Sequence, residues 1–552
     1  MSPARSNAHK ASTEVVELRN LKSSPDRPSS SIEDPVVKIG HKPTVPRSLD
    51  KLIGLVGINS SVVCPWPNFY FVAALNLGNG GSLGLLVGTI VATCGMAPVY
   101  LSLAEKMRKY PTAGGQYHWV AALAPPRMRK SLSYICCCIL TFTWLTFLGA
   151  AAWLFGLDVS AIYLLHTGEY HTWITFTAAI CVQLFACLVN VTWGKHMNTP
   201  ETLVLVVHFV AFLLLLSLLA FAHSTGTVTS DFTFTSATGW SPSFGALLGV
   251  LYATNSLAGF DCAAHIAEDT VEAGRRIPKS LLWSTSVNAI LCIIVALLIC
   301  LTAGDVSALF EGPYGGSYHP IGSIIQLTSN AARGDKSLAS APFGLIAPII
   351  IMCCINTTAA ASRMVFSFVR DDRNAVVQKW MASVSNTSRF RYQRKDADSS
   401  QDLQKEQVPR ITIVLTALSP IIWLWLNFVS SAGFLALGSQ VTLSLATTYM
   451  LAISCSLYSR IYQPDILGRE SNGIFQLGKV WGSLADVLAL CFLSLVWVLA
   501  WFPFTTPIDV AGINYAPIIV SGVVLLGAIY YVTYSHKHYQ NPAPNEGGNY
   551  RA

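Results

Sequence analysis

Charged side chains are scarce in this chain of 552 residues. Asp, Glu, Lys and Arg together make up 12% of the sequence, whereas 52% of the residues are hydrophobic. Soluble domains carry about twice this share of charged residues, so the composition excludes a set of soluble domains and predicts one polytopic membrane domain. We attribute the formal net charge of +7 to membrane topology and expect no nucleic-acid partner.

Cysteine frameworks and catalytic motifs are also missing. The 14 cysteines all fall within predicted membrane spans and show neither a disulfide framework nor a zinc-binding spacing. The sequence contains neither GxxxxGK[ST] nor HExxH, the motifs of phosphate-binding loops and zinc proteases. His208 and His265 have no evident partner serine or cysteine. We therefore expect no metal, no cofactor and no enzyme activity.

Long apolar runs are what the sequence has in abundance. A helix crosses the roughly 30 Å hydrocarbon core with about 20 residues, and twelve runs are long enough. They are 52–77, 83–104, 132–157, 172–192, 201–222, 242–265, 282–303, 342–369, 410–429, 432–458, 484–503 and 514–534. We expect an all-α polytopic membrane protein with 12 transmembrane helices.

The distribution of Lys and Arg predicts the orientation of these helices. With the N terminus inside the cell, the outer loops contain only Arg333 and Lys336, so the other 34 of the 36 basic residues lie in or beside cytoplasmic segments. Basic residues concentrate in cytoplasmic loops of membrane proteins. Both termini are therefore expected in the cytoplasm, as a disordered tail over 1–48 and a short tail over 536–552.

The first predicted span contains an interruption at Cys64-Pro65-Trp66-Pro67. Two prolines one residue apart remove two backbone donors and crowd the preceding turn, so we do not expect a continuous helix there. The alternative is a kink in a packed helix.

The sixth predicted span contains a second interruption, Asn255-Ser256-Leu257-Ala258-Gly259-Phe260-Asp261. Small and polar residues and a carboxylate at this depth are costly in lipid and are tolerated where they line protein or a wet cavity. The two interruptions begin successive blocks of five spans, which is the pattern of inverted-repeat transporters. We expect a permease domain over 49–535 with repeats at about 50–222 and 242–458 and two peripheral helices at about 484–534.

Four stretches carry a family resemblance. They are NGGS (79–82), YPTAGGQYHWVAALAP (110–125), GFDCAAHIAEDTVEAGRRIPKSLLWS (259–284) and INTTAAASRMVFSFVRDDR (355–373). In order and spacing the chain resembles the fungal amino acid/choline/GABA permeases of the amino acid-polyamine-organocation superfamily. The resemblance implies a 5+5 inverted repeat with broken helices 1 and 6. It also aligns Trp66 with a first-span tryptophan, Phe260 with an aromatic gate, and Trp144 with a third-span motif.

The substrate site is expected at the two interruptions. Free backbone N–H groups of half-helices suit a carboxylate, and free carbonyls suit an ammonium group. Asp261 has three open roles, which are pairing with a cationic substrate, titrating during coupling, and capping a helix. The predicted substrate-binding residues are Val63, Cys64, Pro65, Trp66, Trp144, Asn255, Ser256, Ala258, Gly259, Phe260, Asp261, Asn356 and Thr357.

Charged residues on the cytoplasmic side form a candidate gate. We predict that Glu105, Glu268, Arg275 and Arg363 belong to a lattice of ion pairs that closes the inner side when the cavity faces outward. The alternative is a solvated loop whose positive charge only sets topology.

These expectations favour a secondary active transporter that works by alternating access. Following the resemblance, we expect proton symport of amino acids, GABA, choline or a related small amine, with membrane lipid and protons as the other partners. The alternatives are an exporter or importer of a specialised amine or alkaloid, and a nutrient sensor built on a permease fold. We expect the plasma membrane, with the vacuolar membrane as the alternative.

Overall fold

The structure is a computed structural model of the chain that describes residues 51–193, 198–226, 232–315, 321–372, 410–429, 432–463, 476–508, 513–540 and 542. The predicted N-terminal tail over 1–48 and most of the predicted C-terminal tail over 536–552 lie outside the described residues. Every regular element in the described part is a helix. The predicted all-α class is therefore confirmed.

The helices of the first half begin after residue 50. Their bounds are α2 (Leu52–Val63), α3 (Pro65–Lys109), α4 (Gln116–Leu123), α5 (Arg129–Thr167), α6 (Thr172–Trp193), α7 (Asn198–Ser224), α8 (Pro242–Leu257), α9 (Cys262–His265), η1 (Ala267–Asp269) and α10 (Ala273–Thr302).

The second half continues with shorter helices on the loops between long ones. The bounds are α11 (Val306–Glu311), α12 (Gly322–Ala331), α13 (Lys336–Asp372), α15 (Arg410–Leu418), α16 (Ile421–Val429), α17 (Ala432–Tyr462), α19 (Gly478–Leu499), α20 (Ala516–Tyr530), η2 (Tyr531–Ser535) and α21 (His536–His538).

Eleven helical segments in the described part are long and apolar enough to cross a membrane. The first of them, Leu52–Lys109, has 58 residues and covers both of the first two predicted spans. It is interrupted at Cys64 (φ 49°, ψ 52°) and again at Gly81 (φ 68°, ψ −169°). The count of twelve spans and their inverted-repeat relation stay predictions.

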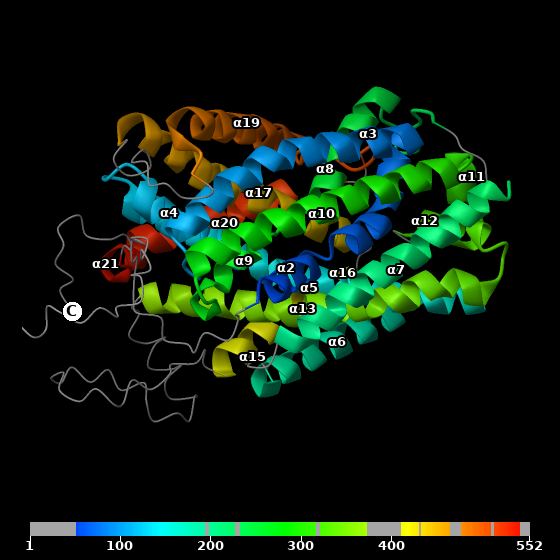
Figure 1. The fold of residues 1–552 in the computed structure, drawn as a ribbon, viewed down its shortest axis with the longest axis horizontal. Coiled ribbons are helices and arrows are strands. Elements are labelled where there is room, and N and C mark those ends of the chain that lie inside the picture. The colour runs from blue at the N-terminus through cyan, green and yellow to red at the C-terminus, as the bar shows by residue number, and fades with distance from the viewer. Residues whose placement is uncertain are drawn as a thin grey trace, which may run out of the picture. The chain divides into compact units, whose positions relative to one another are not determined.

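The interrupted helices lie at the centre of the bundle. In the most apolar stretch of Pro242–His265, 72% of the residues are buried, against 22% for Ala516–His538. α3 packs extensively against both α8 and α10, as its course in Figure 1 shows. The chain therefore places its second interruption where protein rather than lipid surrounds it.

Three consecutive polar residues anchor α2, the short helix before the first interruption. Asn59 Nδ2 donates to Ser280 Oγ on α10 at 3.1 Å, and Asn288 Nδ2 donates to Ser60 Oγ at 3.0 Å. Ser61 Oγ accepts from Asn356 Nδ2 on α13 at 2.7 Å. Because buried polar groups need partners, these bonds fix α2 to helices distant in sequence.

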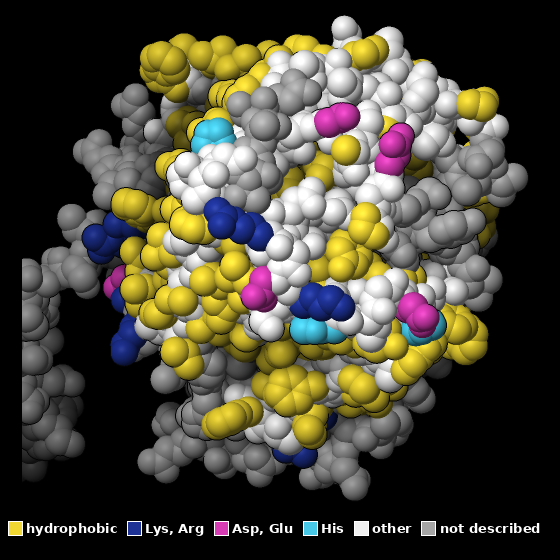
Figure 2. Space-filling model, turned by 90° about the vertical axis from the view of Figure 1, so that its right-hand side faces the viewer, with side chains coloured by type: hydrophobic (Ala, Val, Ile, Leu, Met, Phe, Trp, Pro, Cys, Tyr) yellow, Lys and Arg dark blue, Asp and Glu magenta, His cyan; other side chains and the backbone are white. Residues whose placement is uncertain are grey.

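The face at the α11 and α12 end of the bundle carries few charges. Figure 2 shows that its Lys, Arg, Asp and Glu side chains are separated from one another by hydrophobic and other side chains. The predicted outer residues Arg333 and Lys336 flank the start of α13. The sidedness of the protein in the membrane stays a prediction.

Candidate functional site

The first interruption separates α2 from α3 at a single residue. Cys64 adopts a left-handed conformation, and Pro65 then occupies the first position of α3. Proline suits the start of a helix because the first backbone N–H groups have no intrahelical acceptor. Pro65 and Pro67 therefore begin a second helix and do not merely kink a continuous one.

The second interruption extends from Ala258 to Asp261, between α8 and α9. Gly259 has φ 102°, a conformation that side-chain-bearing residues rarely adopt. Its backbone N–H donates to Tyr449 Oη at 3.3 Å, and Tyr100 Oη donates to the Leu257 carbonyl. Two tyrosines thus satisfy backbone groups that a continuous helix would have paired.

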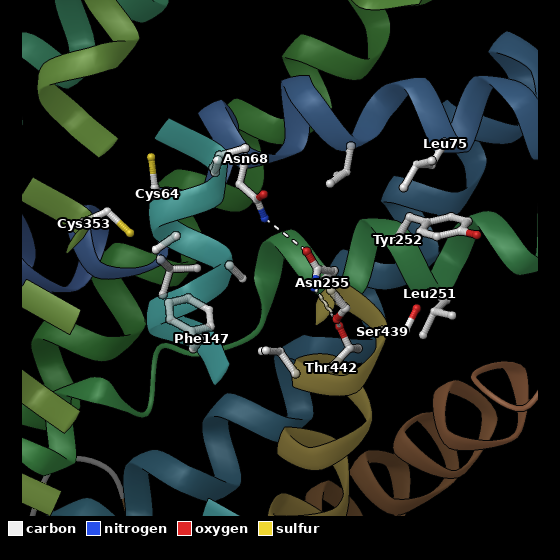
Figure 3. A pocket seen from close by; sticks show the side chains of 17 residues that line it. Cys64, Asn68, Leu75, Phe147, Leu251, Tyr252, Asn255, Cys353, Ser439 and Thr442 are labelled. Carbon is white, nitrogen blue, oxygen red and sulfur yellow. Dashed lines mark hydrogen bonds between the residues drawn. The ribbon is translucent and has the colours of Figure 1, made fainter. Parts of the chain in front are cut away.

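A pocket lies beside both interruptions (Figure 3). Its empty volume is about 730 Å³, a value that includes open solvent at its mouth. Its lining comes from both interrupted helices and from α5, α13 and α17, and no lining side chain is formally charged. The lining residues are Val63, Cys64, Asn68, Val72, Leu75, Phe147, Ala150, Ala151, Leu154, Leu251, Tyr252, Asn255, Cys353, Gly438, Ser439, Val441 and Thr442.

Side-chain amides provide much of the polarity of the pocket. Asn68 Nδ2 donates to Asn255 Oδ1 at 3.2 Å, and Asn255 Nδ2 donates to Thr442 Oγ1 at 2.8 Å. Cys64 and Cys353 lie at one end of the pocket, and Leu75 and Tyr252 at the other (Figure 3).

Aromatic and acidic residues fill the region on the α9 side of the second interruption. Phe260 is fully buried, and its ring packs edge-on against Tyr100, with 5.6 Å between ring centroids. Asp261 accepts hydrogen bonds from Gln116 Nε2 at 2.6 Å and from Tyr449 Oη, and His265 Nε2 lies 3.5 Å from it. Asp261 makes no side-chain cap to α9.

A layer of ion pairs follows on the same side. Asp269 Oδ2 lies 2.5 Å from Arg363 Nε, and Glu268 Oε1 lies 3.2 Å from Arg370 Nη2. These pairs connect η1 to the C-terminal part of α13. Glu268 and Arg363, both predicted gate residues, therefore lie in one layer, although each pairs with a different residue.

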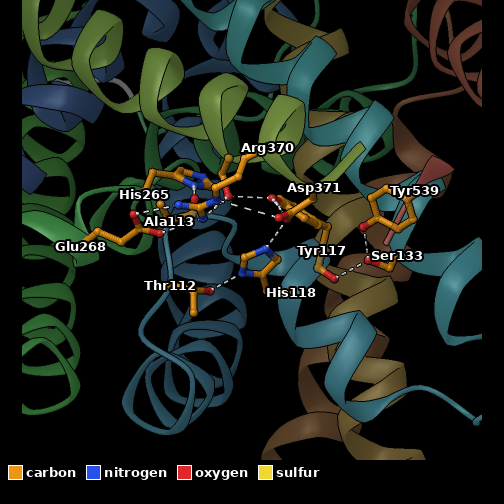
Figure 4. Close-up of polar contacts among 11 residues, drawn as sticks. Thr112, Ala113, Tyr117, His118, Ser133, His265, Glu268, Arg370, Asp371 and Tyr539 are labelled. Atoms are coloured by element: carbon orange, nitrogen blue, oxygen red, sulfur yellow. Dashed lines mark hydrogen bonds and ion pairs between the residues drawn. The ribbon is translucent and has the colours of Figure 1, made fainter. Parts of the chain in front are cut away.

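Next to this layer, a second cluster joins the 110–118 segment to α13 (Figure 4). His118 Nε2 lies 2.9 Å from Asp371 Oδ2, and Tyr117 Oη donates to the same oxygen at 2.9 Å. Burial raises the pKa of Tyr117 above its usual range, so its hydroxyl remains a donor. Tyr539, within the predicted C-terminal tail, is buried, and its hydroxyl lies 2.8 Å from Ser133 Oγ.

The other two predicted gate residues lie elsewhere. Glu105 pairs with Arg460 of α17, and Arg460 Nε donates to Asp486 Oδ2 of α19 at 2.9 Å. This buried network joins α3, α17 and α19, so α19 is more closely tied to the core than a peripheral helix would be. Arg275 is exposed near the start of α10 and makes no ion pair with a described residue.

Of the predicted substrate-binding residues, Val63, Cys64 and Asn255 line the pocket. Pro65, Ser256, Ala258, Gly259, Phe260 and Asp261 are buried at or next to the interruptions but are not lining residues. Their predicted contact with substrate stays a prediction.

Trp66 and Trp144 are buried away from the pocket lining. Trp66 packs edge-on against His208 and Phe212, with centroid distances of 5.6 and 5.7 Å. Trp144 packs against His265 at 5.2 Å and against the lining residue Phe147 at 5.6 Å. Both tryptophans therefore support the walls of the site from behind.

Asn356 and Thr357 lie on α13 behind the first interruption. Asn356 Nδ2 donates to Glu201 Oε1 at 2.6 Å, and Ser61 Oγ donates to Glu201 Oε2 at 3.1 Å. Thr357 Oγ1 donates to the carbonyl of Cys353 at 2.6 Å. Glu201 is fully buried and links α2, α7 and α13.

Asp261 is one of several acidic residues that the described part of the chain buries completely. Asp158, Glu201 and Asp486 are likewise fully buried. Asp158 was missed because α5 continues ten residues beyond residue 157, the end of the apolar run. The missed lining residues Asn68, Phe147, Ser439 and Thr442 carry no signal in their own sequence context.

One motif remains to be placed. Gly80-Gly81-Ser82-Leu83-Gly84 matches G-x-S-x-G, the pattern around the nucleophile of many hydrolases. That motif acts on a strand-to-helix turn, whereas Ser82 lies in the kink of α3 and is fully buried. No group of three His, Cys, Asp or Glu residues in the described part is placed to hold a metal ion.

Proteins similar to this chain are transporters. The family described as "Amino acid permease" matches residues 55–525. A GABA-specific permease of Saccharomyces cerevisiae is 25% identical over 92% of this chain and 85% of that protein. A choline transporter of the same yeast is 22% identical over 87% of this chain and 80% of that protein.

Among solved structures, a manganese transporter of Eremococcus coleocola in complex with an aromatic bis-isothiourea compound is similar. The TM-score is 0.50 at 14% sequence identity, over 93% of this chain and 100% of that chain. At this identity the likeness concerns the fold alone.

Proposed function

The chain belongs to the amino acid permease family, and from this premise we propose that it carries a small amine or amino acid across a membrane by alternating access. Transport rather than enzyme catalysis follows from the family, as does a multi-pass integral membrane protein with eleven candidate spans. The plasma membrane, with both termini in the cytoplasm, is the proposed setting.

The observation that carries the proposal is a pocket with one sealed side. The pocket lies beside two interrupted helices, as in carriers whose binding site is made from discontinuous helices. On the α9 side, Phe260, Asp261 and the Asp269–Arg363 pair fill the space toward the positively charged loops. This arrangement supports a state that faces outward.

The chemistry of the lining favours a cargo that combines apolar surface with a few polar atoms. Asn68, Asn255 and Thr442 offer amide and hydroxyl groups, whereas Phe147 and Leu154 offer apolar contact. The C-terminal end of α2, at the lining residue Val63, carries the negative end of a helix dipole and suits an ammonium group. An amino acid, GABA and a choline-like amine all meet this description.

We also propose coupling to protons. Glu201 receives hydrogen bonds only from neutral groups of Ser61 and Asn356 among the described residues. Its protonation would weaken contacts that hold α2, the short helix before the pocket, to α13. Asp261 is the second candidate because Tyr449 connects it to the backbone of Gly259.

The experiment is uptake into liposomes that contain the purified protein. Labelled amino acids, GABA, choline and other small amines are supplied with an inward proton gradient, with and without an uncoupler. Accumulation of at least one compound, reduced by the uncoupler, is expected. Binding without accumulation of any compound contradicts transport and favours the alternative of a nutrient sensor.

A further inference from the structure

Asp158 has a buried carboxylate that belongs neither to the layer of ion pairs nor to the hydrogen-bond networks described above. Its exposed fraction is 0%, and neither Oδ1 nor Oδ2 has a hydrogen-bond partner in the part of the chain that the structure describes. A charged group in this condition costs several kcal/mol. Ionisable residues inside membrane domains are therefore functional candidates.

The position of Asp158 on α5 connects it to the pocket. Phe147, Ala151 and Leu154 line the pocket, and the steps 147, 151, 154 and 158 follow the helical repeat of four, three and four residues. Asp158 lies about 6 Å farther along the helix axis than Leu154.

The other buried carboxylates near the site already have partners. Asp261 accepts from Gln116 and Tyr449, and Glu201 accepts from Ser61 and Asn356. The lining itself carries no formal charge. A cationic cargo in this pocket would lose hydration without gaining an opposite charge, unless a nearby carboxylate supplied one.

We propose that Asp158 is the counter-charge for a positively charged nitrogen of the cargo. The proposal rests on the proposed transport function and assigns one residue to the positive nitrogen that amino acids, GABA and choline-like amines share. The side chains of the pocket then bind the remainder of the molecule. The C-terminal end of α2 orients the cargo, and the carboxylate selects for its charge.

Binding to purified protein tests the proposal without requiring transport. The probes are choline, GABA and alanine, each compared with an analogue without the positive nitrogen: 3,3-dimethylbutan-1-ol, butyrate and propionate. We expect at least one probe to raise the unfolding temperature of the wild type, its analogue to have no effect, and Asp158→Asn to weaken binding at least tenfold. The control is Asp305→Asn, because Asp305 caps α11 away from the pocket and accepts from Ser307 N.

A second measurement uses wild-type protein in case Asp158→Asn does not fold. Dicyclohexylcarbodiimide reacts with carboxyl groups in apolar surroundings, and mass spectrometry locates the modified residue. Protection of Asp158 by the bound cation is expected, and labelling that saturating cation does not reduce overturns the proposal. Equal binding of a probe and its analogue without the positive nitrogen also overturns the proposal.

The two proposals fail in different ways. If liposomes accumulate a probe equally well with wild type and Asp158→Asn, the site is wrong and the transport function stands. If Asp158-dependent binding is measured but no probe accumulates in liposomes, the site stands and transport is wrong.

Discussion

Asn68 on α3 and Asn255 on α8 are joined directly by a hydrogen bond of 3.2 Å from Nδ2 to Oδ1. The amide nitrogen of Asn255 then donates to the Gly438 carbonyl at 3.0 Å and to Thr442 Oγ1 at 2.8 Å. Asn255 thus connects the helix after the first interruption, the helix before the second, and α17. All four residues line the pocket.

Replacing Asn255 by Ala tests this connection. Each hydrogen bond contributes about 1 kcal/mol net, and the substitution removes three. Asn68 Nδ2 keeps Ser256 Oγ as an acceptor at 3.3 Å. We expect the affinity for cargo to fall about tenfold, because about 1.4 kcal/mol is a factor of ten in binding. Concentration-dependent uptake into liposomes measures the change.

The matched control is Asn427→Ala. Asn427 is also buried, but among the described residues its side chain bonds only to the carbonyl of Trp423 on its own helix, α16. Its substitution should leave the affinity within twofold of the wild type. Equal losses in both variants would mean that Asn255 acts through general stability and not through the pocket.

Gly259 has the unusual backbone conformation that interrupts the helix at 258–261. A Cβ atom there would lie 3.5 Å from Val63 Cγ2, and φ of 102° is unsuitable for a side chain. Backbone strain of this kind costs about 1–3 kcal/mol. We expect Gly259→Leu to reduce uptake to less than about a tenth of the wild-type rate at equal amounts of protein in the membrane.

A control substitution at a second glycine shows whether a leucine side chain by itself reduces uptake. At Gly522 on α20, no heavy atom lies within 4 Å of the position that a Cβ would occupy, and φ is not positive. Gly522→Leu should retain normal uptake. Normal uptake by Gly259→Leu as well would show that the 258–261 segment can change shape without affecting transport.

The sequence was sufficient for the class of fold and for both interruptions. Pro65 and Pro67 disfavour a continuous helix through local covalent geometry, and Gly259 beside Asp261 marks a site unsuited to lipid. Such effects are encoded in neighbouring residues. The structure accordingly ends α2 at Val63 and α8 at Leu257.

Most pocket residues could not be identified in the same way. Ser439 and Thr442 belong to an ordinary apolar helix, and only packing against Asn255 brings them to the site. The ion-pair partner of Glu105 could not be identified from the sequence either, because Arg460 lies 355 positions away. A sequence indicates that a buried charge needs a partner, but the partner depends on tertiary packing.

Substitutions of Asp269 and Arg363 test the layer of ion pairs on the α9 side of the pocket. Asp269→Arg and Arg363→Asp each place like charges together and remove a charge-assisted hydrogen bond worth about 2 kcal/mol. Either single variant should reduce uptake severalfold by weakening the sealed side. The exchanged pair, Asp269→Arg with Arg363→Asp, should recover at least half of the wild-type rate.

The recovery distinguishes an ion pair from two unrelated charges. Uptake and unfolding temperature are both measured, because the double variant must restore each in parallel. A double variant as impaired as the worse single variant would contradict a pairwise interaction. Arg276→Asp with Glu272→Arg exchanges a more exposed pair at the start of α10 and should change neither property.

Asp261 lies between the sealed α9 side of the pocket and the second interruption. Its oxygens accept from Gln116 and Tyr449, so Asp261→Asn replaces one acceptor by an amide donor that faces another donor. We expect uptake to fall at least tenfold, with normal delivery to the membrane as measured by a fluorescent C-terminal tag. Tyr449→Phe keeps the carboxylate and removes one donor, and should cause a smaller loss. Wild-type uptake by Asp261→Asn would remove this carboxylate from the transport cycle and leave Glu201 as the candidate for proton coupling.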